Sequence, residues 1–237
     1  MKVKEVMVKD LVRVEANSTL RNALKIMLER GIRRLVVEEQ GLVTIRDLVY
    51  GWYDKKSYVR DVMAVDLLAV SEDLDLKQAT KIMTSKGVGS LLVVSGDKTV
   101  GIVTERDLIR NCKVEEDIRV GDVMKIDPLL VSPEVEVKEV GLAMKENWER
   151  HAVVVENSLA SGVISIRDVG RAILNDKMDL KASSVMSSPV FKVTPDSSLE
   201  TARSLMSSRN IGFLPVVDPR TLLGSLDERE ILAVFSI

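Results

Sequence analysis

A short pattern that could bind a phosphorylated ligand occurs three times in the chain, and a variant of it occurs once. The full copies read glycine, two apolar residues, serine or threonine, any residue, arginine and aspartate, at 41–47, 101–107 and 162–168. Each follows an apolar run and precedes a segment with helical spacing, which predicts a strand-to-helix junction. Backbone N–H groups and the positive end of the helix dipole attract anions there. The hydroxyl and arginine can donate to phosphate, and the carboxylate can accept both hydroxyls of a ribose, so the pattern suits a nucleotide.

A purely structural interpretation of the same pattern stays open. Ser/Thr-x-x-Asp is also a common way to begin a helix, with the hydroxyl as N-cap. The arginine and the preceding glycine occur in all four copies, including the variant at 224–230. Capping alone does not require either of them. Capping and phosphate binding are compatible, because a capped helix start can still hold an anion.

The elements that must position these junctions come from four internal repeats of about 60 residues. Val-Met pairs mark the repeats, and their methionines are Met7, Met63, Met124 and Met186. A strand-like run, a helical segment, two more strand-like runs, the junction and a second helix then follow in each repeat. In the first helical segment Leu20, Ala23, Leu24, Met27 and Leu28 share one face. The pattern predicts β-α-β-β-α repeats, and a sheet this small needs a partner for its apolar face.

The composition excludes several classes of protein. The 237 residues are 46% hydrophobic and 30% charged, which is ordinary for a globular protein, and the net charge of -2 argues against a nucleic-acid binder. No apolar run reaches the ~18–20 residues of a membrane span, and the N-terminus lacks the apolar core of a signal peptide. Cys112 and His151 are the single cysteine and histidine, so we expect no disulfide, no metal site and a cytoplasmic location. No nucleophile–base pair and no P-loop are visible, so we expect no catalytic residues and no enzyme.

The fourfold repeat order together with the junction pattern resembles tandem CBS domains over nearly the whole chain. The resemblance implies an α/β (α+β) fold with CBS repeats at 1–57, 58–118, 119–180 and 181–237. Repeats 1 and 2 would pair into one Bateman module, 1–118, and repeats 3 and 4 into a second, 119–237, stacked as a disc. Clefts of such modules commonly hold AMP, ADP, ATP or S-adenosylmethionine as a regulatory ligand. A monomeric disc and a homodimer are both open.

The resemblance also assigns roles to individual residues. It assigns the ribose to three aspartates, Asp47, Asp107 and Asp168. It assigns the phosphate to the hydroxyls and arginines of the same junctions, Thr44, Thr104, Ser165, Arg46, Arg106 and Arg167. The base is expected near the start of the second strand, at Val88, Gly89, Arg150 and His151, and a structural role for His151 stays open.

Two repeats depart from the pattern. Repeat 4 has Asp227 at the hydroxyl position and Glu230 at the ribose position. Because a carboxylate repels phosphate, we expect that repeat 4 does not hold a phosphate in the usual way. Repeat 1 is shorter between its second and third strands, at 37–41, which puts its cleft in doubt. Repeats 2 and 3 are therefore expected to carry the best sites.

These observations favour a non-catalytic regulatory or sensor protein. Binding of an adenosine-containing ligand would change the arrangement of the modules, or the binding of an unidentified partner protein, through different affinities for two states. A structural or assembly module with vestigial clefts is the alternative. Repeat 4 favours that alternative, whereas the aspartates and arginines of the other three repeats favour the sensor.

Overall fold

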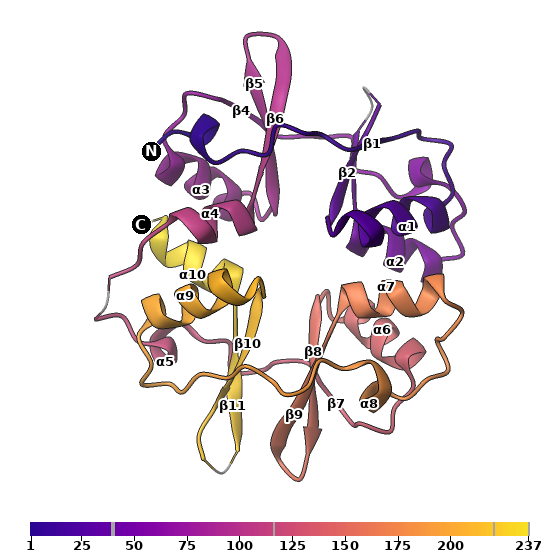
Figure 1. Ribbon diagram of the computed structural model, residues 1–237, viewed down its shortest axis with the longest axis vertical. Helices are drawn as coiled ribbons and strands as arrows, with labels where there is room; N and C mark the ends of the chain where they lie inside the picture. Colours follow the sequence, from indigo (N-terminus) through magenta and orange to yellow (C-terminus); the bar gives the residue numbers. More distant parts are fainter. Residues whose placement is uncertain (39–40, 116, 220, 237) are drawn as a thin grey trace. The chain divides into compact units, whose positions relative to one another are not determined.

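The computed structural model describes residues 1–38, 41–115, 117–219 and 221–236. Repeats 1 to 3 have the expected order of elements, and repeat 4 has the same order without a first strand among the described residues (Figure 1). Repeat 1 contains β1 (Arg13–Val14), α1 (Leu20–Arg30), β2 (Arg34–Val37), β3 (Gly41–Thr44) and α2 (Ile45–Tyr53). Repeat 2 contains β4 (Ala69–Ser71), α3 (Leu76–Ser85), β5 (Ser90–Ser95), β6 (Lys98–Thr104) and α4 (Glu105–Asn111). Repeat 3 contains β7 (Leu130–Val131), α6 (Val137–Glu146), β8 (His151–Glu156), β9 (Leu159–Ser165) and α7 (Ile166–Leu174). Repeat 4 contains α9 (Leu199–Arg209), β10 (Phe213–Val217), β11 (Leu222–Asp227) and α10 (Glu228–Phe235).

The sheets have one topology throughout. In repeats 1 to 3 the first strand runs parallel to the second, and the second runs antiparallel to the third. In repeat 4 a single parallel bridge between Val193 and Val216 stands where the first strand would pair. The predicted class, a mixed α/β fold of β-α-β-β-α repeats, is confirmed. The hairpin of repeat 1 is the shortest, as its sequence predicts, although Glu39 and Gln40 lie outside the described residues.

The chain forms two compact units that each combine two repeats. Unit 1 contains Met1–Leu11, Leu67–Asp127 and Phe191–Ile237, so it joins repeats 2 and 4. Unit 2 contains Val12–Asp66 and Pro128–Val190, so it joins repeats 1 and 3. Helices make the contact between the repeats of a unit: α10 packs on α3 and α4 in unit 1, and α7 packs on α1 and α2 in unit 2. The predicted repeat boundaries, and the sheet pairing of repeats 1 with 2 and 3 with 4, stay predictions.

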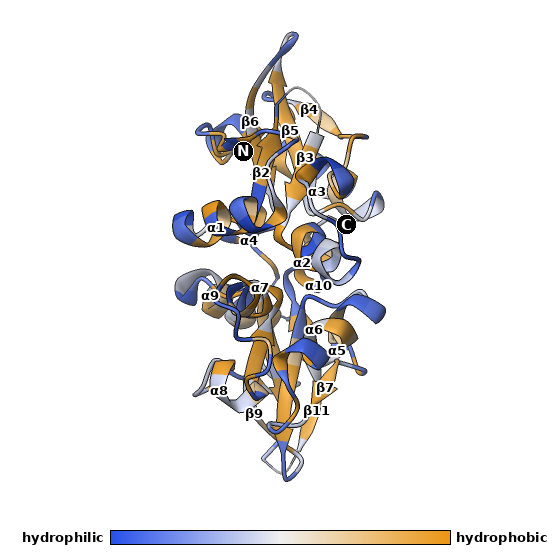
Figure 2. Ribbon diagram, turned by 90° about the vertical axis from the view of Figure 1, so that its right-hand side faces the viewer, coloured by the Kyte–Doolittle hydropathy of each residue, from blue (hydrophilic) through white to orange (hydrophobic). Residues whose placement is uncertain are grey.

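Amphipathic helices and apolar strands supply the core of each unit. Leu20, Ala23, Leu24 and Met27 on α1 are each at most 6% exposed, as their spacing predicts. The strands are mostly hydrophobic in Figure 2, whereas the hairpin tips and outer helix faces are hydrophilic. Each unit therefore buries one continuous core that draws on both of its repeats.

Short segments before the first strands are exchanged between repeats. The segment with η1 (Val3–Glu5) precedes the first strand of repeat 1, yet Val8 bridges to Ile102 in repeat 2. The segment with η2 (Val59–Asp61) precedes the first strand of repeat 2, yet Ala64 bridges to Leu42 in repeat 1. The same exchange places α5 (Val120–Val123) with repeat 4 and α8 (Ala182–Val185) with repeat 3. Each repeat is thus completed by a segment from elsewhere in the chain.

The exchanged segments explain the glycine that begins each junction. A Cβ on Gly101 would lie 2.8 Å from the Met7 sulfur and 2.9 Å from the Val8 carbonyl oxygen, closer than real Cβ atoms come. A Cβ on Gly162 would lie 2.2 Å from the Met186 sulfur. A Cβ on Gly41 or Gly224 would lie 3.4 Å from the sulfur of Met63 or Met124 and 2.4 Å from the carbonyl oxygen of the residue after it, Ala64 or Lys125. The repeated Val-Met pair and the repeated glycine therefore belong to one packing contact.

Candidate functional site

The three full junctions have the same hydrogen-bonded structure. In repeat 1, Thr44 Oγ1 donates to Asp47 Oδ2 over 2.7 Å, and the backbone N–H of Thr44 donates to the same oxygen over 2.8 Å. The equivalent hydroxyl-to-carboxylate distances are 2.7 Å for Thr104 and Asp107 and 2.6 Å for Ser165 and Asp168. This is a capping box, the structural alternative noted for the motif. Each hydroxyl proton is donated to the neighbouring carboxylate.

The capping box leaves one oxygen of each aspartate for other contacts. Among the described residues, Oδ1 of Asp47 and Oδ1 of Asp107 accept no hydrogen bond. Asp168 Oδ1 instead accepts from Arg171 Nη1 over 3.0 Å. Asp107 is 9% exposed, and the other two aspartates are half-buried. Two of the three ribose candidates thus combine a fixed position with an oxygen that can accept.

The expected base residues lie beside the junctions. The carbonyl of Gly89 accepts from the backbone N–H of Glu105 over 3.1 Å, and the carbonyl of Arg150 accepts from that of Ile166 over 2.8 Å. His151 begins β8 and is in register with Ser165, the N-cap of α7. Val88, Gly89, Arg150 and His151 are all half-buried. Within repeat 2, and likewise within repeat 3, the fold therefore places the base candidates next to the phosphate candidates.

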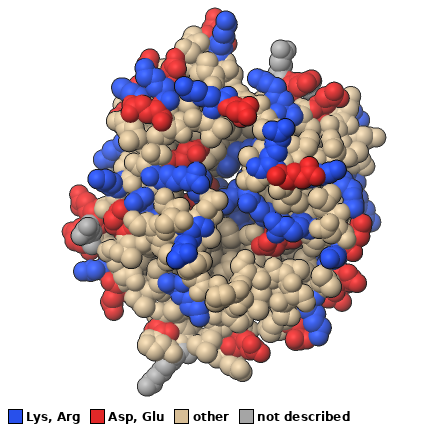
Figure 3. Space-filling view, viewed as in Figure 1, with Lys and Arg blue, Asp and Glu red and all other residues tan. Residues whose placement is uncertain are grey.

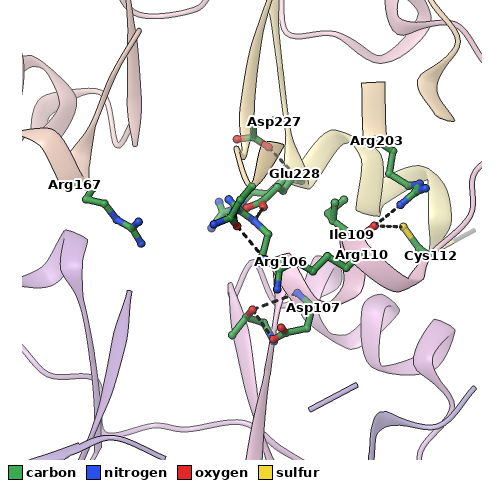
Figure 4. A network of polar contacts seen from close by, with 12 residues as sticks. Arg106, Asp107, Ile109, Arg110, Cys112, Arg167, Arg203, Asp227 and Glu228 are labelled. Carbon is green, nitrogen blue, oxygen red and sulfur yellow. Dashed lines mark hydrogen bonds and ion pairs between the residues drawn. The ribbon is translucent and has the colours of Figure 1, made fainter. Parts of the chain in front are cut away.

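In unit 1 the junction arginine of repeat 2 is engaged by the protein itself. Arg106 forms an ion pair with Glu228 of repeat 4, and its Nη1 donates to the Asn210 side chain over 2.7 Å. Figure 4 shows Arg106, from α4, and Glu228, from α10, turned toward each other. The reciprocal contact, from repeat 4 to repeat 2, is also present: Arg229 Nε donates to Glu105 Oε1 over 2.8 Å. Arg106 Nη2 is buried without a hydrogen-bond partner among the described residues.

In unit 2 isoleucine replaces both of these glutamates. Ile45 and Ile166 are buried at the positions that Glu105 and Glu228 occupy in unit 1. Arg46 lies over the ring of Trp148, with 5.6 Å from Cζ to the ring centroid. Arg167 Nη2 donates to the carbonyl of Gly31 over 3.2 Å. The same arginine position thus has carboxylate partners in unit 1 and a tryptophan ring or a backbone carbonyl in unit 2.

The arginines of the three full junctions contact equivalent positions in the partner repeat of their unit. Gly31, Trp148 and Asn210 each follow the first helix of a repeat and have positive φ, at 67°, 56° and 55°. Arg167, Arg46 and Arg106 contact them in that order. The junction arginine therefore ties the two repeats of a unit together, a role that the sequence pattern does not reveal.

Trp148 has an unusual position among these residues. A bulky side chain rarely adopts positive φ, and glycine or asparagine occupies this position in the other repeats. The side chain is also 71% exposed. Tyr50 packs against it edge to face at 5.9 Å, and the Tyr50 hydroxyl lies 2.9 Å and 2.8 Å from the carbonyls of Met144 and Glu149.

Repeat 4 differs from the others in charge. The backbone N–H of Asp227 donates to Glu230 Oε2 over 2.7 Å, and Asp227 Oδ1 accepts from the N–H of Arg229 over 2.6 Å. Two carboxyl groups thus cap α10, where a hydroxyl and a carboxyl cap α2, α4 and α7. Burial and the neighbouring Asp227 raise the pKa of Glu230 to about 7.

Three further features of the chain concern metal binding, membrane spanning and surface charge. Within the described ranges, no group of three or more His, Cys, Asp or Glu side chains could hold a metal ion. No helix among the described residues is long and apolar enough to cross a membrane. On the face shown in Figure 3, Lys and Arg side chains are interspersed with Asp and Glu.

Comparison with known proteins identifies the family. The family model described as CBS domain matches four stretches of the chain, residues 3–51, 59–113, 120–175 and 182–237. The chain belongs to the CBS-domain family. The resemblance expected from the repeated junctions is thereby confirmed. All the junctions described above lie within these four CBS domains.

Relatives of this CBS-domain chain include proteins that it matches over nearly their whole length and one of which it spans a quarter. It is 24% identical to the uncharacterized protein MJ1225 of Methanocaldococcus jannaschii, over 96% of each chain. The crystal structure of MJ1225, described as a candidate archaeal homolog of g-AMPK, superposes with a TM-score of 0.86 over 99% of this chain and 100% of the other, at 23% identity. A Pyrococcus horikoshii protein superposes over the same shares with a TM-score of 0.71, at 20% identity. Half of the chain is 31% identical to inosine-5'-monophosphate dehydrogenase of Methanocaldococcus jannaschii, of which it spans 25%.

Proposed function

We propose that this CBS-domain protein is a non-catalytic cytoplasmic sensor that binds adenosine-containing ligands and regulates a separate partner. The observation that carries the proposal is the fixed aspartate of the junction. Asp47 and Asp107 are each held through Oδ2 and present Oδ1 without a hydrogen-bond partner in the described residues. A carboxylate oxygen that is already in place can accept ribose hydroxyls at little ordering cost.

The contacts of the arginines support a phosphate-bearing ligand. The junction hydroxyls donate to their own aspartates, so the phosphate contacts must come mainly from arginine. Arg106 keeps one buried Nη2 without a partner among the described residues, which a phosphate oxygen could accept from. Among the residues that the structure describes, Arg46 is held by a cation–π contact, which costs less to give up than a buried ion pair. AMP, ADP, ATP and S-adenosylmethionine are all candidates.

The first test is calorimetric titration of ligand-stripped protein with these four compounds. We expect saturable binding to wild type and a loss of at least tenfold in affinity in Asp47→Asn or Asp107→Asn, because each variant removes the negative charge that accepts the ribose hydroxyls. Asp122→Asn is the matched control, since Asp122 also accepts from an N-cap backbone N–H, over 3.0 Å, but lies outside the junctions. Absence of heat and of thermal stabilisation with all four compounds would refute the sensor.

A second test reports on the phosphate. Trp52→Phe leaves Trp148 as the single tryptophan of the chain. A phosphate that draws Arg46 off the Trp148 ring should change the emission of Trp148, whereas adenosine, which has no phosphate, should not. An equal change with adenosine and AMP would contradict a phosphate contact at Arg46.

An assembly module without ligands is the second candidate. Two reciprocal ion pairs favour this candidate, Arg106 with Glu228 and Arg229 with Glu105. They join the two repeats of unit 1, and they neutralise arginines that would otherwise be available to a phosphate. Wild-type protein that binds none of the four compounds, but loses stability when these pairs are broken, would support this candidate.

A further inference from the structure

The junctions of repeats 1 and 2 offer the same residues to a ligand but hold their arginines differently. In both, a threonine donates to the aspartate three residues later, and this aspartate keeps Oδ1 without a hydrogen-bond partner among the described residues. A ribose would therefore meet equivalent groups at Asp47 and Asp107. The junctions differ in the contacts of the residue before each aspartate, Arg46 in repeat 1 and Arg106 in repeat 2.

Arg106 is held by a buried carboxylate of the partner repeat. It forms an ion pair with Glu228, whose side chain is 2% exposed (Figure 4), and it also donates to the Asn210 side chain over 2.7 Å. Gly212 makes room for the ion pair, because a Cβ there would lie 2.8 Å from Arg106 Nη2 and 2.9 Å from Cδ and Oε2 of Glu228. The charge of Arg106 is thus neutralised inside unit 1.

Different residues occupy the equivalent positions of unit 2. The equivalents of Glu228, Asn210 and Gly212 in repeat 3 are Ile166, Trp148 and Arg150. Isoleucine has no charge, so the ion pair that Arg106 forms in unit 1 cannot form here. Arg46 lies instead over the neutral ring of Trp148, at 5.6 Å from Cζ to the ring centroid.

This difference changes what a phosphate gains at each junction. At repeat 1 a phosphate can take Arg46 from a neutral ring and form a charge-assisted hydrogen bond with it. At repeat 2 a phosphate can accept from Arg106 Nη2, which is buried without a partner among the described residues. It must also compete with Glu228 for the guanidinium, and it brings a second negative charge next to a carboxylate that water and salt screen poorly. Adenosine has no charge and does not meet this repulsion.

We propose that a phosphate strengthens binding at repeat 1 but not at repeat 2, and that Glu228 is the residue that excludes it from repeat 2. Repeat 1 takes adenosine nucleotides, and repeat 2 takes adenosine-containing ligands without a phosphate, such as adenosine or S-adenosylmethionine. This inference rests on the proposed function, because it assigns a ligand class to each of two adenosine sites. The two units of one chain then respond to different classes of adenosine compound.

The test compares adenosine with AMP at each junction separately, by calorimetric titration. The double variant Asp107→Asn, Asp168→Asn keeps Asp47 as its one ribose candidate, and the double variant Asp47→Asn, Asp168→Asn keeps Asp107. We expect AMP to bind at least tenfold more tightly than adenosine when Asp47 is kept. When Asp107 is kept, AMP should bind no more tightly than adenosine. The single variants Asp47→Asn and Asp107→Asn allow the same comparison if a double variant does not fold.

Glu228→Gln tests the discriminating residue, because it keeps an oxygen that accepts from Arg106 but removes the negative charge. Added to the variant that keeps Asp107, it should raise the affinity for AMP at least tenfold and leave the affinity for adenosine within threefold. Glu200→Gln is the matched control, since Glu200 also pairs with an arginine of unit 1, Arg203, but lies outside the junctions. It should change neither affinity.

The possible outcomes separate this inference from the proposed function. AMP that binds repeat 2 tenfold more tightly than adenosine would overturn the inference, and so would equal affinities at repeat 1. An unchanged preference in Glu228→Gln would overturn the role of Glu228. In each of these cases ligand binding itself, and with it the proposed function, would stand. Wild-type protein that binds neither compound would refute both.

Discussion

Arg106 on α4 forms an ion pair with Glu228 on α10, and Arg229 on α10 pairs with Glu105 on α4 at 2.8 Å. The two pairs relate equivalent positions of repeats 2 and 4, so the contact is symmetric although the two junctions differ in sequence. The Glu228 side chain is 2% exposed and that of Arg106 is 13% exposed. Removing one partner of such a buried ion pair leaves the other charge buried without an opposite charge beside it.

We therefore predict that Glu228→Ala lowers the free energy of unfolding by about 3–5 kcal/mol, measured by urea denaturation followed by circular dichroism. The double variant Arg106→Met, Glu228→Ile should recover most of this loss, because an apolar pair replaces two buried charges. Asp73→Ala is the control, since it removes an exposed ion pair with Lys4 and should leave the midpoint nearly unchanged. A double variant no more stable than Glu228→Ala would show that the ion pair itself is required.

A second prediction concerns the glycine of the junction. Gly101→Ala should lower the free energy of unfolding by about 1–3 kcal/mol, because the added Cβ meets both the Met7 sulfur and the Val8 carbonyl oxygen. In Gly170→Ala the Cβ meets the end of the flexible Leu24 side chain at 2.9 Å and gains helix propensity, so the change should stay within about 1 kcal/mol. Equal effects of the two substitutions would contradict the packing explanation of the motif.

A third prediction concerns Tyr50, which is 7% exposed. Its hydroxyl lies within hydrogen-bond distance of the carbonyls of Met144 and Glu149, so it joins repeats 1 and 3. Tyr50→Phe should lower the free energy of unfolding by about 0.5–1.5 kcal/mol, since it removes the hydroxyl that hydrogen-bonds across the two repeats. Tyr58→Phe, at an exposed position, should be neutral in the same denaturation experiment.

A fourth prediction concerns the thiol of Cys112, which is 2% exposed. Burial raises the pKa of this thiol to about 11, so little thiolate is present at pH 8. Iodoacetamide should label native protein slowly at pH 8 and label it completely in 8 M urea. Rapid labelling of the native protein, at the rate of a free cysteine, would mean that the end of α4 opens readily.

The sequence predicts the elements of this fold better than the contacts between them. The periodicity of Leu20, Ala23, Leu24 and Met27 is a local signal, and all four residues are buried. The reason for Gly101 is not local, because its neighbour Met7 lies in a segment that precedes a different repeat. A pattern read along the chain could show that both residues recur, but not that they touch.

The candidate site shows the same division. Capping of α2 by Thr44 and Asp47 follows from the pattern itself, and the structure has it. The contacts of Arg106 with Glu228 and of Arg46 with Trp148 join residues about one hundred positions apart, through helix packing between repeats. The pattern presents these arginines as phosphate ligands, because nothing near them in the sequence points to the helix ends and carboxylates that they contact.

The exchanged segments set an order of events during synthesis. Residues 1–11 are synthesised before the first strand of repeat 1, yet Val8 pairs with Ile102, so this segment is paired only after about ninety further residues have been made. Repeat 1 meanwhile closes as soon as Ala64 arrives to pair with Leu42. A segment made before the first strand of repeat 1 is therefore fixed only after repeat 1 has closed, and deleting residues 1–11 would leave repeat 2 open and not repeat 1.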